Sequence, residues 1–345
     1  MSEHLPSSTR TDSRRPTLKT IAELSGFAVQ TVSRALGDAP DISAKTKATV
    51  RKIADDIGYV PNRAGVRLRT GRTNVISLVL STDHDVLNLS ARLISSVAEG
   101  MRETGYHLVV TPSFPDDDPL KPVLYIVQNR TADAIILNQT LPEDPRVAYL
   151  MERNFPFVTH GRTIWADQHS YFDYDNHAFG RRSIKTLAAR GRKCVLLLAP
   201  PQNQNYAIEM IDGARAEAAQ HGVTLLLSDG ADSDSNRHLV RDYIAGMVKA
   251  HPEIDAIISA SPNATMAAIS GIEQSGLTLG PDFDVFSKEA VPILDLFRPG
   301  VLTEKEDVTR AGQFLSRAAV QVAKGDNVAP LQQLDGPDMT GRSET

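Results

Sequence analysis

Residues 18–36 constrain this chain more than any other stretch, because they join two short helical patterns across Gly26. Thr17 can cap a first helix that begins at Leu18, and a second helix is expected over Val29–Leu36. A tight turn between two such helices requires a residue like glycine. The stretch therefore predicts a helix-turn-helix, whose second helix turns polar side chains outward.

A third helix is expected over residues 44–57, with Ser43 as its N-cap and Gly58 as its terminator. Its apolar residues recur at helical spacing and predict a buried stripe. The expected core residues of this region are Ile21, Leu24, Val32, Leu36, Val50, Ile53, Ala54 and Ile57. Residues 16–60 should thus form a small all-α headpiece.

The outward face of the second helix carries side chains suited to DNA. Gln30 can pair with a base edge, Arg34 can reach guanine O6 and N7, and Val29 can pack on a thymine methyl. Thr31 and Ser33 are short hydroxyls suited to phosphate. An ordinary helical hairpin with a solvated face is the alternative, since glycine-containing helix pairs are common.

A second basic segment follows at residues 61–72, where arginines surround the single large apolar residue Leu68. The segment is too short, and with Gly65 too flexible, to be a stable helix in water. We expect it to fold against DNA and a second copy, with Leu68 wedged between base pairs. A basic interdomain linker is the alternative. The expected DNA contacts are Thr17, Val29, Gln30, Thr31, Ser33, Arg34, Asn62, Arg63 and Leu68.

The charge is divided unevenly. Residues 1–72 carry 13 Lys and Arg against 7 Asp and Glu, whereas the rest carries 24 against 35. A basic head on an acidic body suits a protein whose head alone touches polyanions. Residues 1–15, rich in Ser, Thr and Arg, are expected to be a flexible tail. The single cysteine, the lack of a long apolar run and the polar start predict a cytoplasmic, nucleoid-associated protein without a membrane partner.

From residue 73 onward, short apolar runs alternate with amphipathic stretches. The runs, expected to be buried strands, are 75–80, 107–110, 133–137, 194–198, 224–227 and 255–258. The stretches between them are expected to end at Gly105, Gly191, Gly222 and Gly276. The series runs to about Tyr174 and again from about Gly180 to Phe286. Residues 73–345 should therefore be an α/β body of two parallel-sheet lobes, with a ligand cleft between them.

Such a cleft takes its polar groups from the carboxyl ends of strands. His160 and Arg162, beside the only tryptophan, Trp165, suit a sugar, because sugars need forked hydroxyl partners and an apolar face. Asp173 and Asp175 are nearby acceptors. For each residue, a solvated loop or a structural bond between the lobes is an equal alternative. The expected effector contacts are Asp83, Asn138, His160, Arg162, Trp165, Asp175, Ser261 and Glu289.

Enzyme chemistry has no visible site. There is no glycine-rich phosphate loop after the first strand and no Gly-x-Ser-x-Gly elbow, and the nine histidines show no ligand spacing. Cys194 opens an apolar run and is expected to be a core thiol. We therefore predict no catalytic residue, no cofactor and no metal.

Four runs of the sequence resemble the lactose-repressor/galactose-repressor family of bacterial transcription regulators. They are Leu18-Lys-Thr-Ile-Ala-Glu-Leu-Ser-Gly, Gln30-Thr-Val-Ser-Arg-Ala-Leu, Ser43-Ala-Lys-Thr and Gly58-Tyr-Val-Pro-Asn-Arg. The runs from Asn62 to Arg72 and from His160 to Thr163 are similar to α-glucoside-type members. The resemblance implies a headpiece, a hinge helix and a body similar to periplasmic sugar-binding proteins. It places base contacts on Val29, Gln30 and Arg34, the hinge leucine on Leu68, and effector contacts near Asn138, His160, Asp175, Met210, Ser261 and Glu289.

The resemblance further implies a homodimer that represses a carbohydrate uptake or catabolic operon. It would bind a pseudo-palindromic, double-stranded operator and respond to a small sugar-like effector. A solute-binding module without a DNA role and an α/β enzyme are the rivals. Four departures from the family pattern stand out: Phe27-Ala28 for Val-Ser, Gly65 for alanine, Met210 for a ligand-holding arginine, and Ser261-Pro-Asn for Ser-Asn-Asp. With Met210 at that position, Arg162 is the candidate to supply the missing fork.

Overall fold

The computed structural model describes residues 16–60, 65, 67, 70–82, 87–290, 292–325 and 329–336. Contacts between residues divide the chain into two units, 1–73 and 74–345, which are described separately. The tail expected over residues 1–15 lies outside the described residues, as do Asn62, Arg63 and Leu68. The hinge over residues 61–72 therefore stays a prediction.

The first unit forms the three helices expected: α1 (Leu18–Ser25), α2 (Val29–Leu36) and α3 (Ala44–Asp56). Thr17 caps α1, because its Oγ1 accepts a hydrogen bond from the Thr20 N–H at 3.3 Å. Gly26 follows α1 with a φ of 73°, a left-handed conformation that glycine adopts freely. Ala28 precedes α2 and gives it no side-chain cap, as its methyl group requires.

The core of the headpiece differs at one expected position. Ile21, Val32 and Val50 are fully buried, but Leu24 is 59% exposed. The prediction for Leu24 is wrong because α1 turns a different stripe inward. Leu18 and Ala22 pack beside Ile21 on that stripe, and Leu24 points away from it.

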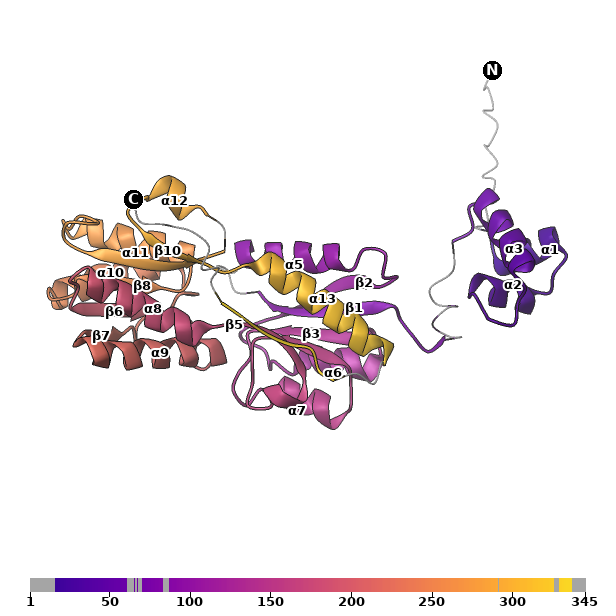
Figure 1. The fold of residues 1–345 in the computed structure, drawn as a ribbon, viewed down its shortest axis with the longest axis horizontal. Coiled ribbons are helices and arrows are strands. Elements are labelled where there is room, and N and C mark those ends of the chain that lie inside the picture. The colour runs from indigo at the N-terminus through magenta and orange to yellow at the C-terminus, as the bar shows by residue number, and fades with distance from the viewer. Residues whose placement is uncertain are drawn as a thin grey trace, which may run out of the picture. The chain divides into compact units, whose positions relative to one another are not determined.

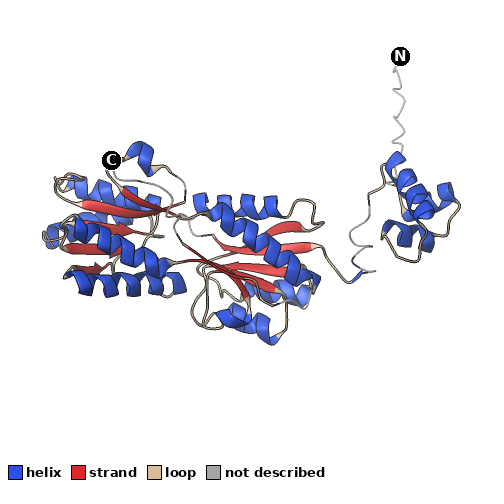
Figure 2. Ribbon diagram, in the orientation of Figure 1, coloured by secondary structure: helices blue, strands red, loops and turns tan. Residues whose placement is uncertain are grey.

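The second unit consists of two lobes, each a parallel sheet with helices on both faces, as predicted (Figures 1 and 2). Among the described residues the sheet of lobe 1 has the order β11-β5-β4-β3-β1-β2 and that of lobe 2 has the order β10-β9-β8-β6-β7. The strands of lobe 1 are β1 (Val75–Ser81), β2 (His107–Ser113), β3 (Ala134–Asn138), β4 (Phe157–His160), β5 (Ser170–Tyr174) and β11 (Gln332–Asp335). Those of lobe 2 are β6 (Cys194–Leu198), β7 (Thr224–Leu227), β8 (Ala256–Ser259), β9 (Asp284–Glu289) and β10 (Leu302–Lys305).

Helices fill the connections between the strands. Lobe 1 contains α5 (Leu87–Gly100), α6 (Lys121–Asn129), α7 (Pro145–Glu152), the 3-10 turn η1 (Ala166–Gln168) and α13 (Val308–Lys324). Lobe 2 contains α8 (Asn176–Ala189), α9 (Asn205–His221), α10 (Arg237–Ala250), α11 (Pro262–Gln274) and α12 (Leu294–Phe297). Of the four glycines expected to end helices, only Gly222 is the C-cap of one, α9. Gly105, Gly191 and Gly276 lie beyond the helix ends, where each has a positive φ.

Lobe 1 includes a part of the chain that the sequence pattern did not assign to it. After β10 the chain returns from lobe 2, and α13 packs along α5 and across β3, β4 and β5 (Figure 1). Strand β11 then pairs with β5, with Gln332 opposite Tyr171. The apolar core of lobe 1 accordingly combines Leu78 and Ile136 with Phe314 and Leu315 of α13.

Two glycines set the packing of α8 against α9 in lobe 2. A Cβ atom on Gly180 would meet the carbonyl oxygen of Met210, and one on Gly213 would meet the carbonyl oxygen of His177. The two helices thus touch backbone to backbone, and Met210 is fully buried in the core beside them.

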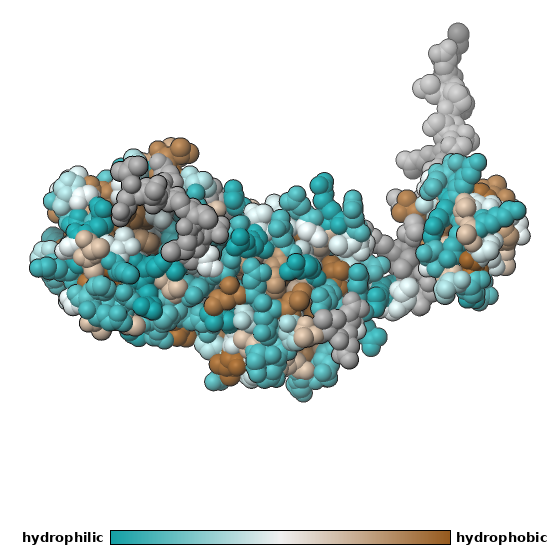
Figure 3. Space-filling model, in the orientation of Figure 1, coloured by the Kyte–Doolittle hydropathy of each residue, from teal (hydrophilic) through white to brown (hydrophobic). Residues whose placement is uncertain are grey.

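The visible surface of the second unit is mostly hydrophilic, with small apolar patches (Figure 3). One patch lies over α12, where Leu296 and Phe297 are exposed. Within the described part of the chain, every helix is too short or too polar to cross a membrane.

Candidate functional site

The outward face of α2 presents the side chains that the sequence assigned to DNA. Val29, Gln30 and Arg34 are exposed, while Thr31 and Ser33 are half-buried at the edge of the helix. Thr17 is also exposed, although its hydroxyl is engaged as the cap of α1. The arrangement leaves Val29, Gln30 and Arg34 accessible on the outside of α2.

Arg34 already has a partner within the headpiece. Its Nη2 lies 2.5 Å from Oδ2 of Asp41, and both side chains are about half exposed. An ion pair this exposed contributes little to stability, about 0.2–1 kcal/mol. The pair with Asp41 therefore holds Arg34 in place only weakly.

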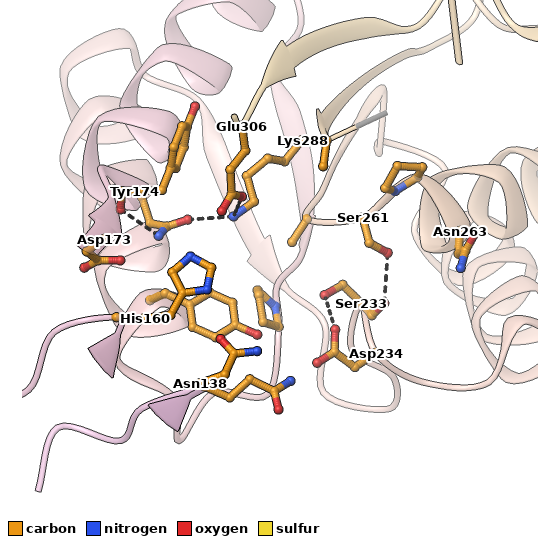
Figure 4. Close-up of a pocket in the computed structure, with 18 of the residues that line it drawn as sticks. Asn138, His160, Asp173, Tyr174, Ser233, Asp234, Ser261, Asn263, Lys288 and Glu306 are labelled. Carbon is orange, nitrogen blue, oxygen red and sulfur yellow. Dashed lines mark hydrogen bonds and ion pairs between the residues drawn. The ribbon is translucent and has the colours of Figure 1, made fainter. Parts of the chain in front are cut away.

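A cavity of about 140 Å³ lies between the two lobes of the second unit, and it is many times larger than a single water requires. The carboxyl ends of β3, β4, β5, β6, β8, β9 and β10 surround it, as expected for two facing parallel sheets. Figure 4 shows its main polar side chains. The lining comprises Asn138, Gln139, His160, Gly161, Asp173, Tyr174, Asn176, Pro200, Tyr206, Ser233, Asp234, Ala260, Ser261, Pro262, Asn263, Lys288, Ala290, Ile293 and Glu306.

The wall after β3 is held by a buried ion pair. Arg146 and Asp144 pair at 2.7 Å at the start of α7, and Nη2 of Arg146 donates to the carbonyl oxygens of Asn138 and Gln139. Gln139 has a φ of 53°, a left-handed conformation that is unfavourable for a residue with a side chain. The guanidinium of Arg146 stabilises that conformation and so fixes the direction of the cavity wall.

His160 brings an unsatisfied ring nitrogen to the cavity. Its Nδ1 is buried without a hydrogen-bond partner among the described residues. Burial lowers the pKa of His160, against the opposing effect of the Glu306 and Asp173 carboxylates. The ring is therefore neutral at pH 7, with one nitrogen that donates and one that accepts. Such a ring can both give a hydrogen bond to a hydroxyl group and accept one from it.

A buried lysine closes another side of the cavity (Figure 4). Nζ of Lys288 lies 2.8 Å from Oε2 of Glu306 and donates to Oδ1 of Asn176 at 3.0 Å. It also lies over the rings of Tyr174 and Tyr206, 5.2 and 5.7 Å from their centroids. Burial opposes ionisation of Glu306, but Lys288 outweighs it and holds the pKa of Glu306 below its usual range.

The carboxylate of Asp173 lines the cavity beside His160 and is bound from behind. Nε of Arg162 donates to its Oδ2 at 2.8 Å. Burial raises the pKa of Asp173 to about 6, although the hydrogen bond from Arg162 opposes the shift. Asp173 is thus mostly ionised at pH 7, and its charge is matched by Arg162.

Two serine hydroxyl groups of lobe 2 also line the cavity, those of Ser233 and Ser261. Oγ of Ser261 caps α11 by accepting from the Ala264 N–H, and it donates to the carbonyl oxygen of Ser233 at 3.0 Å. Oγ of Ser233 donates to Oδ1 of Asp234 (Figure 4). These bonds order the loop before α10 against the start of α11.

The structure brings some of the expected effector residues to the cavity and not others. Asn138, His160 and Ser261 line it, and Asp83 lies outside the described residues. Glu289 points away from the cavity because side chains alternate along a strand, so its neighbour Lys288 faces inward instead. Oε1 of Glu289 accepts from the Leu294 N–H at 2.8 Å.

Three further expected residues have structural partners and do not line the cavity. Asp175 caps α8 by accepting from the Ala178 N–H. Trp165 packs against the apolar cluster around Val147 and Leu150, which is separate from the cluster that contains α13. The guanidinium of Arg162 is engaged by Asp173 and Glu209, so the role expected for it in place of the arginine missing at position 210 stays a prediction.

Sequence reasoning missed Tyr206, Ser233, Asp234 and Glu306. Glu306 follows β10, whose residues Leu302–Lys305 show no apolar run that would predict a strand. Tyr206 lies in the first turn of α9, where an aromatic residue is indistinguishable from a core residue by spacing alone. No local signal marks Ser233 or Asp234.

A helix-turn-helix unit joined to a two-lobed body with a cavity at its strand ends defines a DNA-binding transcription regulator with a small-molecule-binding body. Residues 17–62 match the model of bacterial regulatory proteins of the lacI family. Residues 73–308 match that of periplasmic binding proteins and the sugar-binding domain of the LacI family. The chain belongs to the LacI family, as its sequence motifs predicted.

Individual relatives agree with this assignment. The HTH-type transcriptional regulator AglR of Rhizobium meliloti (strain 1021) is 27% identical over 339 residues, which cover 95% of this chain and 94% of the relative. The structure of a lac repressor dimer bound to operator and an anti-inducer has a TM-score of 0.79 at 20% identity, covering 94% of this chain and 97% of that one. A transcriptional regulator CelR–cellobiose complex has a TM-score of 0.68 at 23% identity, covering 94% and 98%. At these identities the structures support the shared fold.

Proposed function

We propose that this chain is a homodimeric repressor of a carbohydrate uptake or catabolic operon. The dimer binds a pseudo-palindromic operator through α2 of each copy, because one headpiece reads only a few base pairs. A neutral, sugar-like effector in the cavity between the lobes controls operator affinity. This activity belongs at the nucleoid in the cytoplasm, and it requires no catalytic step.

The pairing of charges in the cavity carries the proposal. Asp173 is paired with Arg162, and Lys288 is paired with Glu306, so these charged groups do not demand an ionic ligand. The remaining polar lining, such as His160 and Asn138, can exchange hydrogen bonds with hydroxyl groups. Burial holds the pKa of Tyr206 well above its usual range, so its phenol stays protonated and uncharged.

Family relatives support the ligand class. The solved CelR complex contains cellobiose, a neutral disaccharide, in a protein of the same fold. Lys288 occupies the space over the Tyr174 and Tyr206 rings that a cationic ligand would otherwise favour.

The test combines calorimetry with an operator gel shift. A duplex is first selected from a random pool by the full-length protein, and cellobiose, maltose, trehalose and lactose are then added singly. We expect at least one neutral sugar to bind and to change operator affinity, with glucose 6-phosphate as the charged control. The proposal would be contradicted if the protein selected no two-fold symmetric DNA, or if only charged ligands changed its operator affinity. An Asn138→Ala variant should bind the active sugar more weakly while it keeps operator binding.

A further inference from the structure

One ion pair crosses from lobe 1 to lobe 2 at the cavity. Arg162 follows β4 in lobe 1, and its Nη2 lies 2.5 Å from Oε2 of Glu209 on α9 of lobe 2. Its Nε binds Asp173, which belongs to lobe 1 like Arg162 itself. Movement of the lobes apart would therefore break the bond to Glu209 and leave the bond to Asp173 intact.

Three further hydrogen bonds connect Arg162 and Glu209 through Thr140 and Asn205, and with the ion pair they form a closed ring. Oγ1 of Thr140 donates to the carbonyl oxygen of Arg162 at 2.8 Å, and the Asn205 N–H donates to the carbonyl oxygen of Thr140 at 2.9 Å. Nδ2 of Asn205 donates to Oε1 of Glu209 at 3.3 Å. We call Arg162, Glu209, Asn205 and Thr140 the lobe clasp. Arg162 and Thr140 belong to lobe 1, and Glu209 and Asn205 belong to lobe 2. The bonds between them therefore hold the two lobes in one relative position.

The backbone beside the clasp is shaped to allow this contact. Gly161 has a φ of 113°, and a Cβ atom at this position would overlap Oγ1 of Thr140. Glycine is therefore required between His160, which faces the cavity, and Arg162, which faces lobe 2. A single turn of the chain thus links the ligand site to the clasp.

The clasp lies next to the cavity and does not line it. Gly161 and Asp173 line the cavity, whereas Arg162 and Glu209 do not. The side chains of Arg162 and Glu209 are 24% and 23% exposed, so water screens their attraction only in part. Arginine–carboxylate pairs of this kind are among the stronger hydrogen-bonded contacts.

We propose that the lobe clasp holds the two lobes closed over the effector and so determines how fast the effector is released. Arg162 and Glu209 are then positioning residues, which act through lobe closure. This inference rests on the proposed function of the cavity. It separates two tasks between neighbouring residues, since His160 and its neighbours select the ligand and Arg162 retains it.

The test uses Glu209→Gln, which removes the charge that crosses between the lobes and leaves Arg162 bound to Asp173. The matched control is Glu217→Gln on the same helix. Glu217 pairs with Arg181 at 2.8 Å, but both residues belong to lobe 2. Stopped-flow release of the sugar identified by calorimetry is measured on the full-length proteins.

We expect Glu209→Gln to release the sugar about fivefold faster with little change in association rate, and Glu217→Gln to match the parent. Release from the parent should also accelerate with salt, and that dependence should be weaker in Glu209→Gln. Equal release rates in Glu209→Gln and the parent would overturn the proposal.

A second measurement needs no ligand and separates failure of the clasp from failure of the proposed function. Spin labels at Glu152→Cys on α7 and Gln220→Cys on α9, both at exposed positions, report the distance between the lobes. The clasp predicts one narrow distance in the parent and in Glu217→Gln, and a broader, longer distribution in Glu209→Gln. Identical distributions in all three proteins would refute the clasp, even if no sugar bound at all.

Discussion

Replacing Asp41 with asparagine is expected to tighten operator binding. Arg34 lies 2.5 Å from Asp41, and the side chains are 51% and 50% exposed. A pair this exposed is worth about 0.2–1 kcal/mol, which Arg34 must give up when it reaches a base. Asp41→Asn removes most of that competition, so affinity should rise by up to about fivefold. Fluorescence anisotropy with a labelled operator duplex measures the change.

The control is Asp38→Asn, which removes the same charge but frees no side chain of α2. Asp38 pairs with Lys47 and Arg51 of α3, at 3.0 and 2.8 Å. Asp41→Asn should alter discrimination between single-base operator variants, whereas Asp38→Asn should not. In an Arg34→Ala background the gain from Asp41→Asn should disappear. Tightening that persists without Arg34 would refute the reasoning, because the freed guanidinium would not be its source.

Three other experiments test the body. Gly180→Ala should destabilise the protein by about 1–3 kcal/mol in urea unfolding, because its methyl group meets the backbone oxygen of Met210; unchanged stability would contradict the close helix contact. Sugar binding seen by calorimetry should leave the emission of Trp165 unchanged, since the indole does not line the cavity; a large shift would place it near the ligand. Because burial raises the pKa of Asp173 to about 6, above its unfolded value, its contribution to stability is greatest below the unfolded pKa and is lost as pH rises through 6. Between pH 7 and pH 4, the free energy of unfolding of the parent should therefore rise by on the order of 2 kcal/mol relative to that of Asp173→Asn. If the free energies of unfolding of the two proteins changed in parallel with pH, the raised pKa would be wrong.

Much of the fold could be predicted from local sequence. The run at Cys194–Leu198 consists of apolar residues alone and became a strand buried along its whole length. Strand β11 could not be found in the same way, because Gln332–Asp335 is mostly polar and pairs only at one edge of its sheet. Its place depends on β5, which lies far away in the sequence and carries no matching motif.

The cavity shows the same division. His160 and Asn138 were predictable because parallel strands end at a common edge, and a polar residue there faces the ligand site. Arg162 also follows the carboxyl end of a strand, yet its guanidinium pairs with Glu209 of the other lobe. A pairing between lobes depends on how two domains approach each other, and no local pattern records that approach. Whether a residue such as Arg162 lines the cavity or binds the other lobe can therefore be decided only once the fold is known.

The return of α13 and β11 to lobe 1 has a consequence for synthesis on the ribosome. Lobe 2 is built from one continuous segment, whereas the sheet of lobe 1 has its edge strand β11 at residues 332–335. Chains emerge at about 5–20 residues per second, so residues 74–174 wait roughly 7–30 s for α13, with the apolar surface that it covers exposed. Lobe 2 can complete its core during that interval. The lobe begun first is therefore the lobe finished last, and until then it is the part of the nascent protein most exposed to aggregation and to chaperones.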